Sequence, residues 1–448
     1  MKRPILIALF CAFGTTLPAS ESTAAANPLV QRLTLDDAIT RARANSPRLE
    51  SYGALTRAAS ESVRGAEAGR RPDLDIQAAY SRNSNVPELI LSSPGAPPRV
   101  IFPNLPSQWR THVGASLPIY TGGRVQSQVG AAREAEGASI ADRAAALNDL
   151  VAETHIGYIN VLFARETARV LREAIASYEA HLKDSRAREE VGLAASHEVL
   201  AVTVERERAE LGRVLADNAS AVATANLLRL VGLPPETEVE LDPTPADFLA
   251  TPVPLPVSLD DQVKRASAGR PELEALRARI RSLEATSRVA QSSSRPQAGI
   301  LAGFDYSNPN PRILPLAGEW KDSWSIGLSV SWKILDGGRS SASAAQSQAQ
   351  ADALRAQLRD LESRIRLDVT TRRLELGSAV AGKAVALRGI EAAKDAVRVA
   401  KDRYREGVLT SSELLDAETR LLRAELEATQ TEAQIQIALA NLARAVGR

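Results

Sequence analysis

Two short stretches of the chain alternate between apolar and polar residues, which is the pattern of an amphipathic β-strand. The clearest runs from Trp324 to Ile334, and Trp109 to Ile119 shows the same alternation less strictly. Each spans about 11 residues, the length that a tilted strand needs to cross the hydrocarbon layer of a membrane. Weaker alternation precedes each of these stretches. We therefore predict four strands, at residues 73–83, 109–119, 298–307 and 323–334.

Much longer stretches show apolar or small residues at steps of three and four, the spacing of packed helices. In the first half these positions are Ile140, Ala144, Leu147, Val151, Thr154, Tyr158 and Val161. No proline interrupts residues 124–191, so we predict one helix there of about 100 Å. Shorter helices are predicted at residues 35–71 and 196–231, and end to end they match the long helix in length. Two short helices can therefore pack along one long helix.

The second half of the chain repeats the first. Leu35-Asp36-Asp37 recurs 224 residues later as Leu259-Asp260-Asp261, and Gly122-Gly123-Arg124 recurs 215 residues later as Gly337-Gly338-Arg339. Such self-similarity indicates a duplication, so matching helices are predicted at residues 259–295, 339–406 and 411–446. The expected organisation is a first repeat at residues 27–233, a proline-rich extended linker at 234–257 and a second repeat at 258–448.

The N-terminus has the pattern of a secretory signal peptide. Lys2 and Arg3 precede an apolar run, and three alanines at residues 24–26 supply the small residues of a cleavage site. We expect residues 1–26 to be removed on export. Cys11 suggests lipidation as an alternative, although Phe10 stands before it where a small residue is required. After this segment no run of roughly 18 apolar residues occurs, so we expect no inner-membrane helix.

Charge and composition exclude several functions. Lys and Arg number 55 against 54 Asp and Glu, so no sequence-wide positive field favours nucleic acid. The single Cys and the single Met both precede residue 27, which leaves no thiolate or thioether metal site in the remainder. The histidines are scattered without metal-ligand spacing, at His112, His155, His181 and His197. No arrangement of residues suggests catalysis, and we expect neither an enzyme, a cofactor nor a bound metal.

Paired glycines mark the two passages from strand to long helix. Gly122-Gly123 and Gly337-Gly338 follow a predicted strand and open a predicted helix. A phosphate-binding loop is the alternative, but no Gly-Lys-Ser/Thr follows. The glycines instead permit a sharp change of direction. Thr121 and Asp336 are expected to act as N-caps, accepting hydrogen bonds from the free backbone N–H groups.

Single glycines mark the opposite ends of the long helices. Gly192 and Gly407 are predicted to end these helices in short turns. Ser196 and Ser411 are then expected to cap the helices that follow, with Ser412 as an alternative to Ser411. Two helical hairpins result, one from each repeat.

Four strands cannot close a barrel within one chain, because an open sheet edge in lipid leaves backbone groups unpaired. Two chains would supply eight strands, whose interior is filled by side chains, whereas three would supply twelve and leave room for a channel. The pattern therefore favours an oligomer that forms one pore. Two amphipathic hairpins on a soluble coiled coil are the alternative.

Several segments together resemble the TolC family of outer-membrane efflux proteins, over essentially the whole chain after the signal peptide. They are residues 33–38, 117–124, 191–193, 332–339, 404–407 and 414–417. The resemblance implies a mostly α fold with a small β portion, in which a homotrimer forms a long coiled-coil α-helical barrel joined to a 12-stranded β-barrel. It implies a location in the outer membrane of a Gram-negative bacterium, among outer-membrane lipid, with the tunnel extending into the periplasm.

The same resemblance implies passive export. Substrates would reach the duct from an inner-membrane RND, ABC or MFS transporter through a periplasmic adaptor (membrane fusion) protein. The outer component of type I protein secretion is one alternative, because a duct does no chemistry that would reveal its cargo. A periplasmic coiled-coil scaffold without a pore is the other.

Site residues follow from the resemblance as well. The hairpin tips would dock the adaptor through Gly192, Leu193, Ala194, Ser196, Gly407, Val408, Leu409 and Thr410. Tyr404 and Glu198 match a gate hydrogen-bond pair, and Leu409 stands where some members carry a gate arginine. Glu413 and Asp416 match two acidic rings. These two acids are three residues apart, hence on one helix face, and three-fold symmetry would turn each into a ring that attracts cations.

Overall fold

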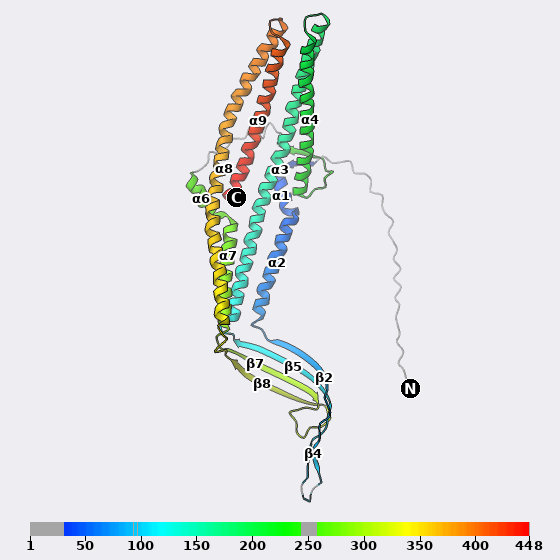
Figure 1. Cartoon of the computed structure of the whole chain (residues 1–448), viewed down its shortest axis with the longest axis vertical. Coiled ribbons are helices and arrows are strands. Elements are labelled where there is room, and N and C mark those ends of the chain that lie inside the picture. Colours follow the sequence, from blue (N-terminus) through cyan, green and yellow to red (C-terminus); the bar gives the residue numbers. More distant parts are fainter. Residues whose placement is uncertain (1–30, 93, 96, 243–257, 448) are drawn as a thin grey trace, which may run out of the picture.

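The molecule is long and narrow, with helices along most of its length and strands at one end (Figure 1). The computed structural model describes residues 31–92, 94–95, 97–242 and 258–447. The predicted signal peptide at residues 1–26 and residues 243–257 of the predicted linker lie outside the described residues. Within the described residues, no helix combines the length and the apolar character needed to cross a membrane.

Both halves build the same helices in the same order. The first half forms α1 (Leu35–Asn45), α2 (Pro47–Ala68), α3 (Arg124–Glu190) and α4 (Ser196–Val231). The second half forms α6 (Leu259–Gly269), α7 (Pro271–Ser292), α8 (Arg339–Arg405) and α9 (Ser411–Ala445). The long helices α3 and α8 each have 67 residues. The duplication read from the sequence is thus repeated in the structure, element by element.

The helices predicted at residues 35–71 and 259–295 are each broken in two, so the prediction of continuous helices there was wrong. The breaks fall at Ser46 and Arg270, whose backbones are extended, with ψ of 115° and 116°. Each precedes a proline, Pro47 or Pro271, which lacks an N–H group and pushes the preceding residue out of the helical region. The proline then starts the next helix, where its missing N–H is no loss.

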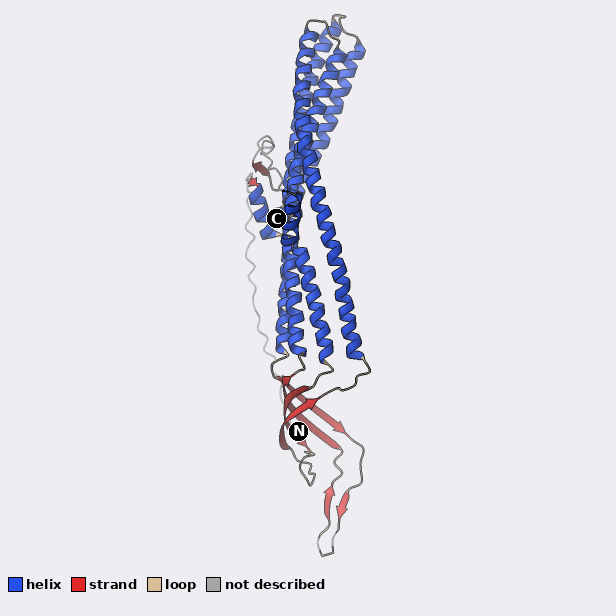
Figure 2. Cartoon of the chain, turned by 90° about the vertical axis from the view of Figure 1, so that its left-hand side faces the viewer, coloured by secondary structure: helices blue, strands red, loops and turns tan. Residues whose placement is uncertain are grey.

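The short helices pack along the long ones, as their lengths predict. α2 and α4 lie along α3, while α7 and α9 lie along α8. α3 also contacts α7 and α9, so it joins the two halves. Next to the sheet the lateral order is therefore α2, α3, α7, α8, and next to the helical tips it is α4, α3, α9, α8 (Figures 1 and 2). The helices form a single curved layer with two open edges.

The strands form one antiparallel sheet in the order β2 (Asp73–Arg82), β5 (Ser107–Tyr120), β7 (Gln297–Asn308) and β8 (Lys321–Ser331). They lie within a few residues of the four predicted strands. Apolar residues meet across the strands, with Val113 opposite both Ile76 and Phe304, and Phe304 opposite Trp324. One whole face is consequently apolar, and it is exposed: Ile76 and Trp324 are both 71% accessible. A face of this kind suits lipid rather than water.

The opposite face of the sheet is polar. His112 lies opposite Gln77 on one side and Asp305 on the other. The Asp305 carboxylate accepts a hydrogen bond from Nε of Arg110 at 2.8 Å and lies 2.9 Å from Nδ1 of His112. Alternation of this type, with one apolar and one polar face, is found in membrane barrels whose interior is wet.

Two further pairs of strands are present that were not predicted from the sequence. β3 (Leu89–Leu91) and β4 (Arg99–Phe102) form a hairpin that projects beyond the main sheet (Figure 1). β1 (Gln31–Thr34) pairs in parallel with β6 (Val239–Asp242), so residues 239–242 are not an extended linker as predicted. The hydroxyl of Tyr158 on α3 lies 3.0 Å from the Leu33 carbonyl oxygen and 2.9 Å from that of Asp242, which fixes this pair to the helices. Burial raises the pKa of Tyr158 to about 12, so the hydroxyl remains a donor at neutral pH.

Candidate functional site

The two helical tips lie at the end of the molecule farthest from the sheet (Figure 1). Gly192 and Gly407 adopt the left-handed conformation, with φ of 78° and 75°. The N–H of Leu193 donates to the Arg188 carbonyl at 2.8 Å, and the N–H of Val408 donates to that of Arg403 at 3.0 Å. These are the closing hydrogen bonds of a glycine-terminated helix. The predicted helix ends are therefore confirmed.

Both tips expose an aliphatic side chain. Leu193 is 77% accessible and Val408, its equivalent in the repeat, is 73% accessible. Of the other predicted docking residues, Ser196 and Thr410 are exposed, and Ala194 and Leu409 are half-buried. Leu409 packs on the apolar cluster that contains Tyr404. The tips thus present two equivalent apolar points to a partner.

The helix starts at the tips differ from the predicted ones. Thr410, not Ser411, is the N-cap of α9, and it forms a capping box with Glu413. The N-cap of α4 is Ala195, which has no capping side chain, and Ser196 is the first helical residue. Thr410 takes this role because its backbone is extended, with ψ of 157°, so its hydroxyl reaches the N–H of Glu413 at 3.3 Å. The first turn of α9 is therefore stabilised by a side-chain cap, and the first turn of α4 is not.

Replacing Thr410 by alanine is expected to lower the free energy of unfolding by about 1 kcal/mol, the usual value of a threonine N-cap. Hydrogen bonds from the backbone and hydroxyl of Thr410 hold the pKa of Glu413 below its ordinary value of 4.5. The contribution of that carboxylate is therefore present above pH 4.5 and is lost as the pH falls through the lowered value.

Thermal melts of wild type and Thr410→Ala should differ most at neutral pH. The difference should shrink in acid but not vanish, because the hydrogen bond from the Glu413 N–H to the Thr410 hydroxyl does not titrate. Ser412→Ala is the matched control, because Ser412 is an exposed neighbour in the same helical turn. Equal melting of the Thr410 and Ser412 variants at neutral pH would contradict the capping role.

The strand-to-helix junctions use their glycines as predicted, with a correction to the caps. The N-cap positions themselves are Gly123 and Gly338, both with positive φ. Thr121 and Asp336 lie two residues earlier and still accept from the helix: Oγ1 of Thr121 from the Val125 N–H at 3.3 Å, and Asp336 from the Ser340 N–H at 2.9 Å. The paired glycines lengthen the turn by two residues, which is why the capping side chains stand farther from the helix.

The predicted gate residues lie close to the tips. Glu413 and Asp416 are both exposed, and Glu198 is half-buried near the start of α4. The Glu413 carboxylate accepts hydrogen bonds from the N–H of Thr410 at 3.0 Å and from its hydroxyl at 2.8 Å. It is therefore ionised at neutral pH. Their assignment to acidic rings stays a prediction.

The side chain of Tyr404 contacts two other residues of the same chain. Its hydroxyl lies 3.2 Å from Oγ of Ser185, and the Arg188 guanidinium stacks on its ring, 4.1 Å from the centroid. Only 4% of Tyr404 is accessible. Among the hydrogen bonds of the described residues none joins Tyr404 to Glu198, so that gate pair also stays a prediction.

A buried polar network lies beside Tyr404. It was not predicted from the sequence, in which His181 was assigned no special role. Nδ1 of His181 lies 2.9 Å from Oε2 of Glu418, and its Nε2 lies 3.0 Å from Oγ of Ser411. Ser411 in turn lies 3.2 Å from Ser185. Side-chain accessibilities of 1% for His181 and 3% for Glu418 show that water does not reach the pair.

The second oxygen of Glu418 is also satisfied. Its Oε1 accepts a hydrogen bond from Ser177 at 2.8 Å and lies 3.2 Å from the Lys401 ammonium. Burial alone would raise the pKa of Glu418, but hydrogen bonds from His181 and Ser177 and the nearby positive charges outweigh it, so the pKa lies below its ordinary value. Glu418 is accordingly a buried anion at neutral pH.

One signal in the sequence does point to this network. His181 and Ser185 continue the three-and-four spacing of the buried face of α3, three and seven residues after the buried Tyr178. A polar residue at such a position needs a buried polar partner. The partner, Glu418, is 237 positions away in the chain, and the spacing alone does not identify it.

No three His, Cys, Asp or Glu side chains within the described parts of the chain gather as metal ligands would. The candidate site consists of the exposed tips and of a polar contact between α3 and α9. Residues 38–233 and 263–448 match the family model described as outer membrane efflux protein. The chain belongs to this family.

Relatives of this outer membrane efflux protein agree with that assignment. OprJ, an outer membrane protein of Pseudomonas aeruginosa, is 27% identical over 350 residues, or 75% of this chain and 69% of OprJ. The outer membrane efflux protein BepC of Brucella suis is 24% identical over 65% of this chain and 61% of BepC. The crystal structure of VceC from Vibrio cholerae superposes with a TM-score of 0.74 at 18% identity, covering 92% of this chain and 96% of VceC.

Family membership confirms the sequence-based expectation of a TolC-like fold and of a location in the Gram-negative outer membrane. The exposed apolar face of the sheet is consistent in character with a surface that contacts lipid. The helical tips lie at the opposite end of the molecule from this face.

Proposed function

We propose that three copies of the chain close into one passive duct, which carries substrates across the outer membrane after an inner-membrane transporter has delivered them through a periplasmic adaptor. The observation that carries this proposal is the single-layer architecture. Both the sheet and the helices are open at their two lateral edges. Rotational symmetry would pair every such edge with the opposite edge of a neighbouring copy.

The sheet edges are β2 and β8, each of which pairs with one neighbour within the described residues. In lipid, the unpaired backbone groups of such an edge are too costly to leave open. Joining β2 of one copy to β8 of the next removes both edges. Three copies give twelve strands, enough for a channel with the polar residues Arg110, His112 and Asp305 on its inner wall.

The helical edges carry apolar side chains that nothing covers in the single chain. On α4 they recur at steps of four and seven residues and are 50–71% accessible: Leu200, Val204, Leu211, Leu215 and Val222. On α8, exposed aliphatic residues recur at multiples of seven: Leu367 and Leu374, then Val385 and Val399. Spacing of this kind is the seam of a coiled coil. The α4 edge of one copy therefore fits the α8 edge of the next.

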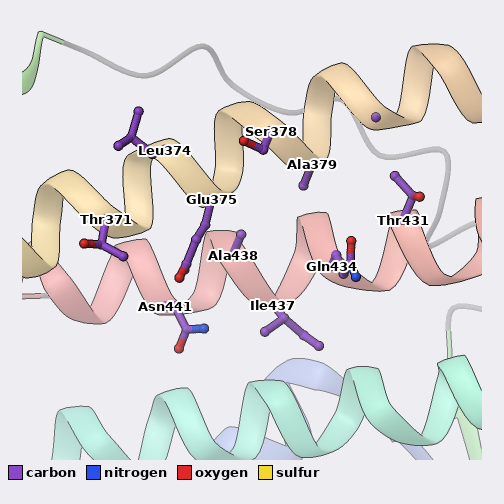
Figure 3. Close-up of a pocket in the computed structure, with 11 residues that line it drawn as sticks. Thr371, Leu374, Glu375, Ser378, Ala379, Thr431, Gln434, Ile437, Ala438 and Asn441 are labelled. Atoms are coloured by element: carbon purple, nitrogen blue, oxygen red, sulfur yellow. The ribbon is translucent and has the colours of Figure 1, made fainter.

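The surface next to the α8 edge is also hollowed. A groove runs between α8 and α9, with Leu374 and Ser378 on one wall and Ile437 and Asn441 on the other (Figure 3). Because Leu374 belongs to both the groove and the exposed α8 edge, a neighbouring copy that covers this edge also shields the groove.

The tips suit the adaptor-docking role. Leu193 and Val408 are exposed aliphatic residues on opposite hairpins, and three copies would present them as six equivalent points around one rim. An adaptor that binds this rim would deliver substrates from an inner-membrane pump, of the RND, ABC or MFS class. The efflux function named for BepC and for the family supports export as the role.

A photo-crosslinking amino acid at Leu193 or Val408 tests the docking. We expect each to capture a periplasmic adaptor protein in intact cells, and the adaptor to bring its inner-membrane transporter with it on purification. The matched control is the same amino acid at Leu55 on α2, which is 57% accessible but far from the tips. Capture of the adaptor from Leu55 but not from the tips would contradict the docking assignment.

Neutralising Glu413 and Asp416 together, as Glu413→Gln with Asp416→Asn, is expected to lower the preference of the channel for cations. Three copies would remove six negative charges from the rim of the tunnel, and such rings concentrate cations. Reversal potentials in a salt gradient measure the effect. The control pair Glu50→Gln with Glu61→Gln removes two exposed charges from α2, and equal shifts in both variants would contradict the ring.

A further inference from the structure

The β3–β4 segment, called here the outer hairpin (residues 86–91 and 99–104), lies beyond the sheet and exposes apolar side chains (Figure 1). Its exposed aliphatic and aromatic side chains are 38–63% accessible: Val86, Leu89, Ile90, Leu91, Val100 and Phe102. Three of them are consecutive in one strand, so they cannot all lie on the same face. Among the described helices and strands, β3 and β4 pack chiefly on each other. A lone two-stranded hairpin is only marginally stable in water, so an apolar partner would stabilise it.

The outer hairpin is attached to one open edge of the sheet. It follows β2 along the chain, and β2 is an edge strand. The Asn83 N–H donates to the Pro106 carbonyl oxygen at 2.7 Å, which closes the root of the hairpin. A second bond, from the Val86 N–H to Oδ1 of Asn104 at 3.2 Å, continues this closure toward β3. The hairpin therefore starts from the edge that the proposed function assigns to contact with the next copy.

The loop between β7 and β8 (residues 309–320) is attached to the other open edge. Two hydrogen bonds hold it to β8, which is the second edge strand. Nδ2 of Asn310 donates to the Lys321 carbonyl oxygen at 3.0 Å. The Arg312 guanidinium donates to the Trp324 carbonyl oxygen at 3.1 Å. The loop is thus fixed beside the strand that would meet β2 of a neighbouring copy.

This loop also exposes apolar side chains. Leu314 is 67% accessible. Trp320 is 43% accessible, and its ring stacks on that of Tyr306 with the centroids 4.9 Å apart. Each copy therefore carries an exposed apolar hairpin at one edge of the sheet and an exposed apolar loop at the other.

Joining β2 of one copy to β8 of the next would bring these two surfaces together. Consecutive strands of the sheet are antiparallel throughout, so β8 runs opposite to β2. The registers place the end of β2, at Arg82, and the start of β8, at Lys321, at the same end of the sheet. The outer hairpin of one copy would consequently emerge beside the 309–320 loop of the next.

We propose that the outer hairpin packs its apolar side chains on the 309–320 loop of a second copy of this chain and so holds the trimer together beyond the ends of the barrel strands. The proposal rests on the proposed function, since the two surfaces meet only when neighbouring copies join. The contact is between different surfaces of the two copies, and three such contacts close a ring. A segment that the barrel itself does not need thereby acquires a role in assembly.

The first test places a photo-crosslinking amino acid at Leu91, which is 63% accessible, in intact cells. We expect covalent dimers on denaturing gels, with the probe attached to residues 313–321, which trypsin releases by cutting after Arg312 and Lys321. The matched control is the same amino acid at Ile119, which is 58% accessible and lies in β5 at the helical end of the sheet. The control should not label this peptide. A probe at Leu91 that captures lipid or another protein, and never residues 313–321 of a second copy, would overturn the proposal.

The second test removes the hairpin. Because Asn83 and Pro106 are joined by a hydrogen bond, replacing residues 84–105 by Gly-Gly leaves a two-residue turn between β2 and β5. We expect trimers that conduct as wild type does but that dissociate at least tenfold faster on heating in detergent. Dissociation at the wild-type rate would contradict the role of the hairpin in holding the trimer.

Single substitutions connect this effect to the proposed contact. Leu91→Ser is expected to speed dissociation about tenfold, because one aliphatic side chain loses its burial at each interface. Ser92→Ala, a change at the exposed neighbouring residue, should have no effect. Leu91→Ser combined with Leu314→Ser should dissociate little faster than either single variant, because both remove the same contact. Fully additive effects would show that the two leucines do not meet.

The two proposals fail in different ways. Wild-type trimers that conduct, without capture of residues 313–321 from Leu91, would overturn the contact and leave the duct intact. Trimers that pass no current, with this capture present, would contradict the duct and support the contact between copies.

Discussion

Leu211→Glu combined with Leu215→Glu is expected to leave the chain folded but monomeric. Both leucines are 61% accessible on the α4 edge, where the account places the neighbouring copy. Each forfeits roughly 1.5–3 kcal/mol of apolar burial at every interface, and the new carboxylates face an apolar partner without a counter-charge. Three interfaces lose this stabilisation together, so the trimer should not form. The mass of the detergent-solubilised protein measures the effect.

Leu211→Ala with Leu215→Ala is the matched control, because it shortens the same side chains without adding charge. It should weaken the trimer and not abolish it. Helix content should remain close to wild type in both variants, since α4 packs on α3 through the opposite face, which carries Val202 and Ala209. Trimers of undiminished stability in the glutamate variant would show that α4 does not form the interface.

Gly407→Arg is expected to abolish export while trimers persist. The backbone at Gly407 has a φ of 75°, and a side chain there would meet no atom within 4 Å. The substitution therefore strains the turn and adds a charge beside Val408 without disturbing the core. If the tip docks the adaptor, the altered turn should prevent docking. Survival of an efflux-deficient host on the substrates that wild type exports measures the loss.

Gly407→Asn is the control for the backbone, because asparagine tolerates the left-handed conformation better than other residues. It should retain most of the export activity. Gly192→Arg tests the equivalent turn of the other hairpin, whose φ is 78° with equally open surroundings. Normal export by both arginine variants would refute the assignment of the tips as the docking surface.

Features that depend on local spacing were predictable from the sequence. The four strands were found because apolar and polar residues alternate on the two faces of a sheet, and the long helices because no proline interrupts them. The breaks at Ser46 and Arg270 were signalled by Pro47 and Pro271, and the N-cap at Thr410 by its capping box. The longer helical pattern nevertheless favoured continuous helices across both prolines. The serine next to Thr410 favoured a cap one residue too late.

Features that depend on distant partners were not predictable in the same way. β1 and β6 are separated by some two hundred residues, and His181 and Glu418 by 237. The apolar spacing on the long helices also misplaced at least one residue: Ile140 lies on the predicted seam and is 53% accessible. A helix within a single layer has neighbours on two sides, so one periodic stripe does not describe its buried surface.

The central claim is that three chains form one conducting duct. Planar-bilayer recording from purified particles whose mass has been determined tests it most directly. We expect particles of three chains that insert in discrete steps, each adding the same stable current, with cations preferred. Particles of another stoichiometry that conduct, or trimers that insert and pass no current, would contradict it.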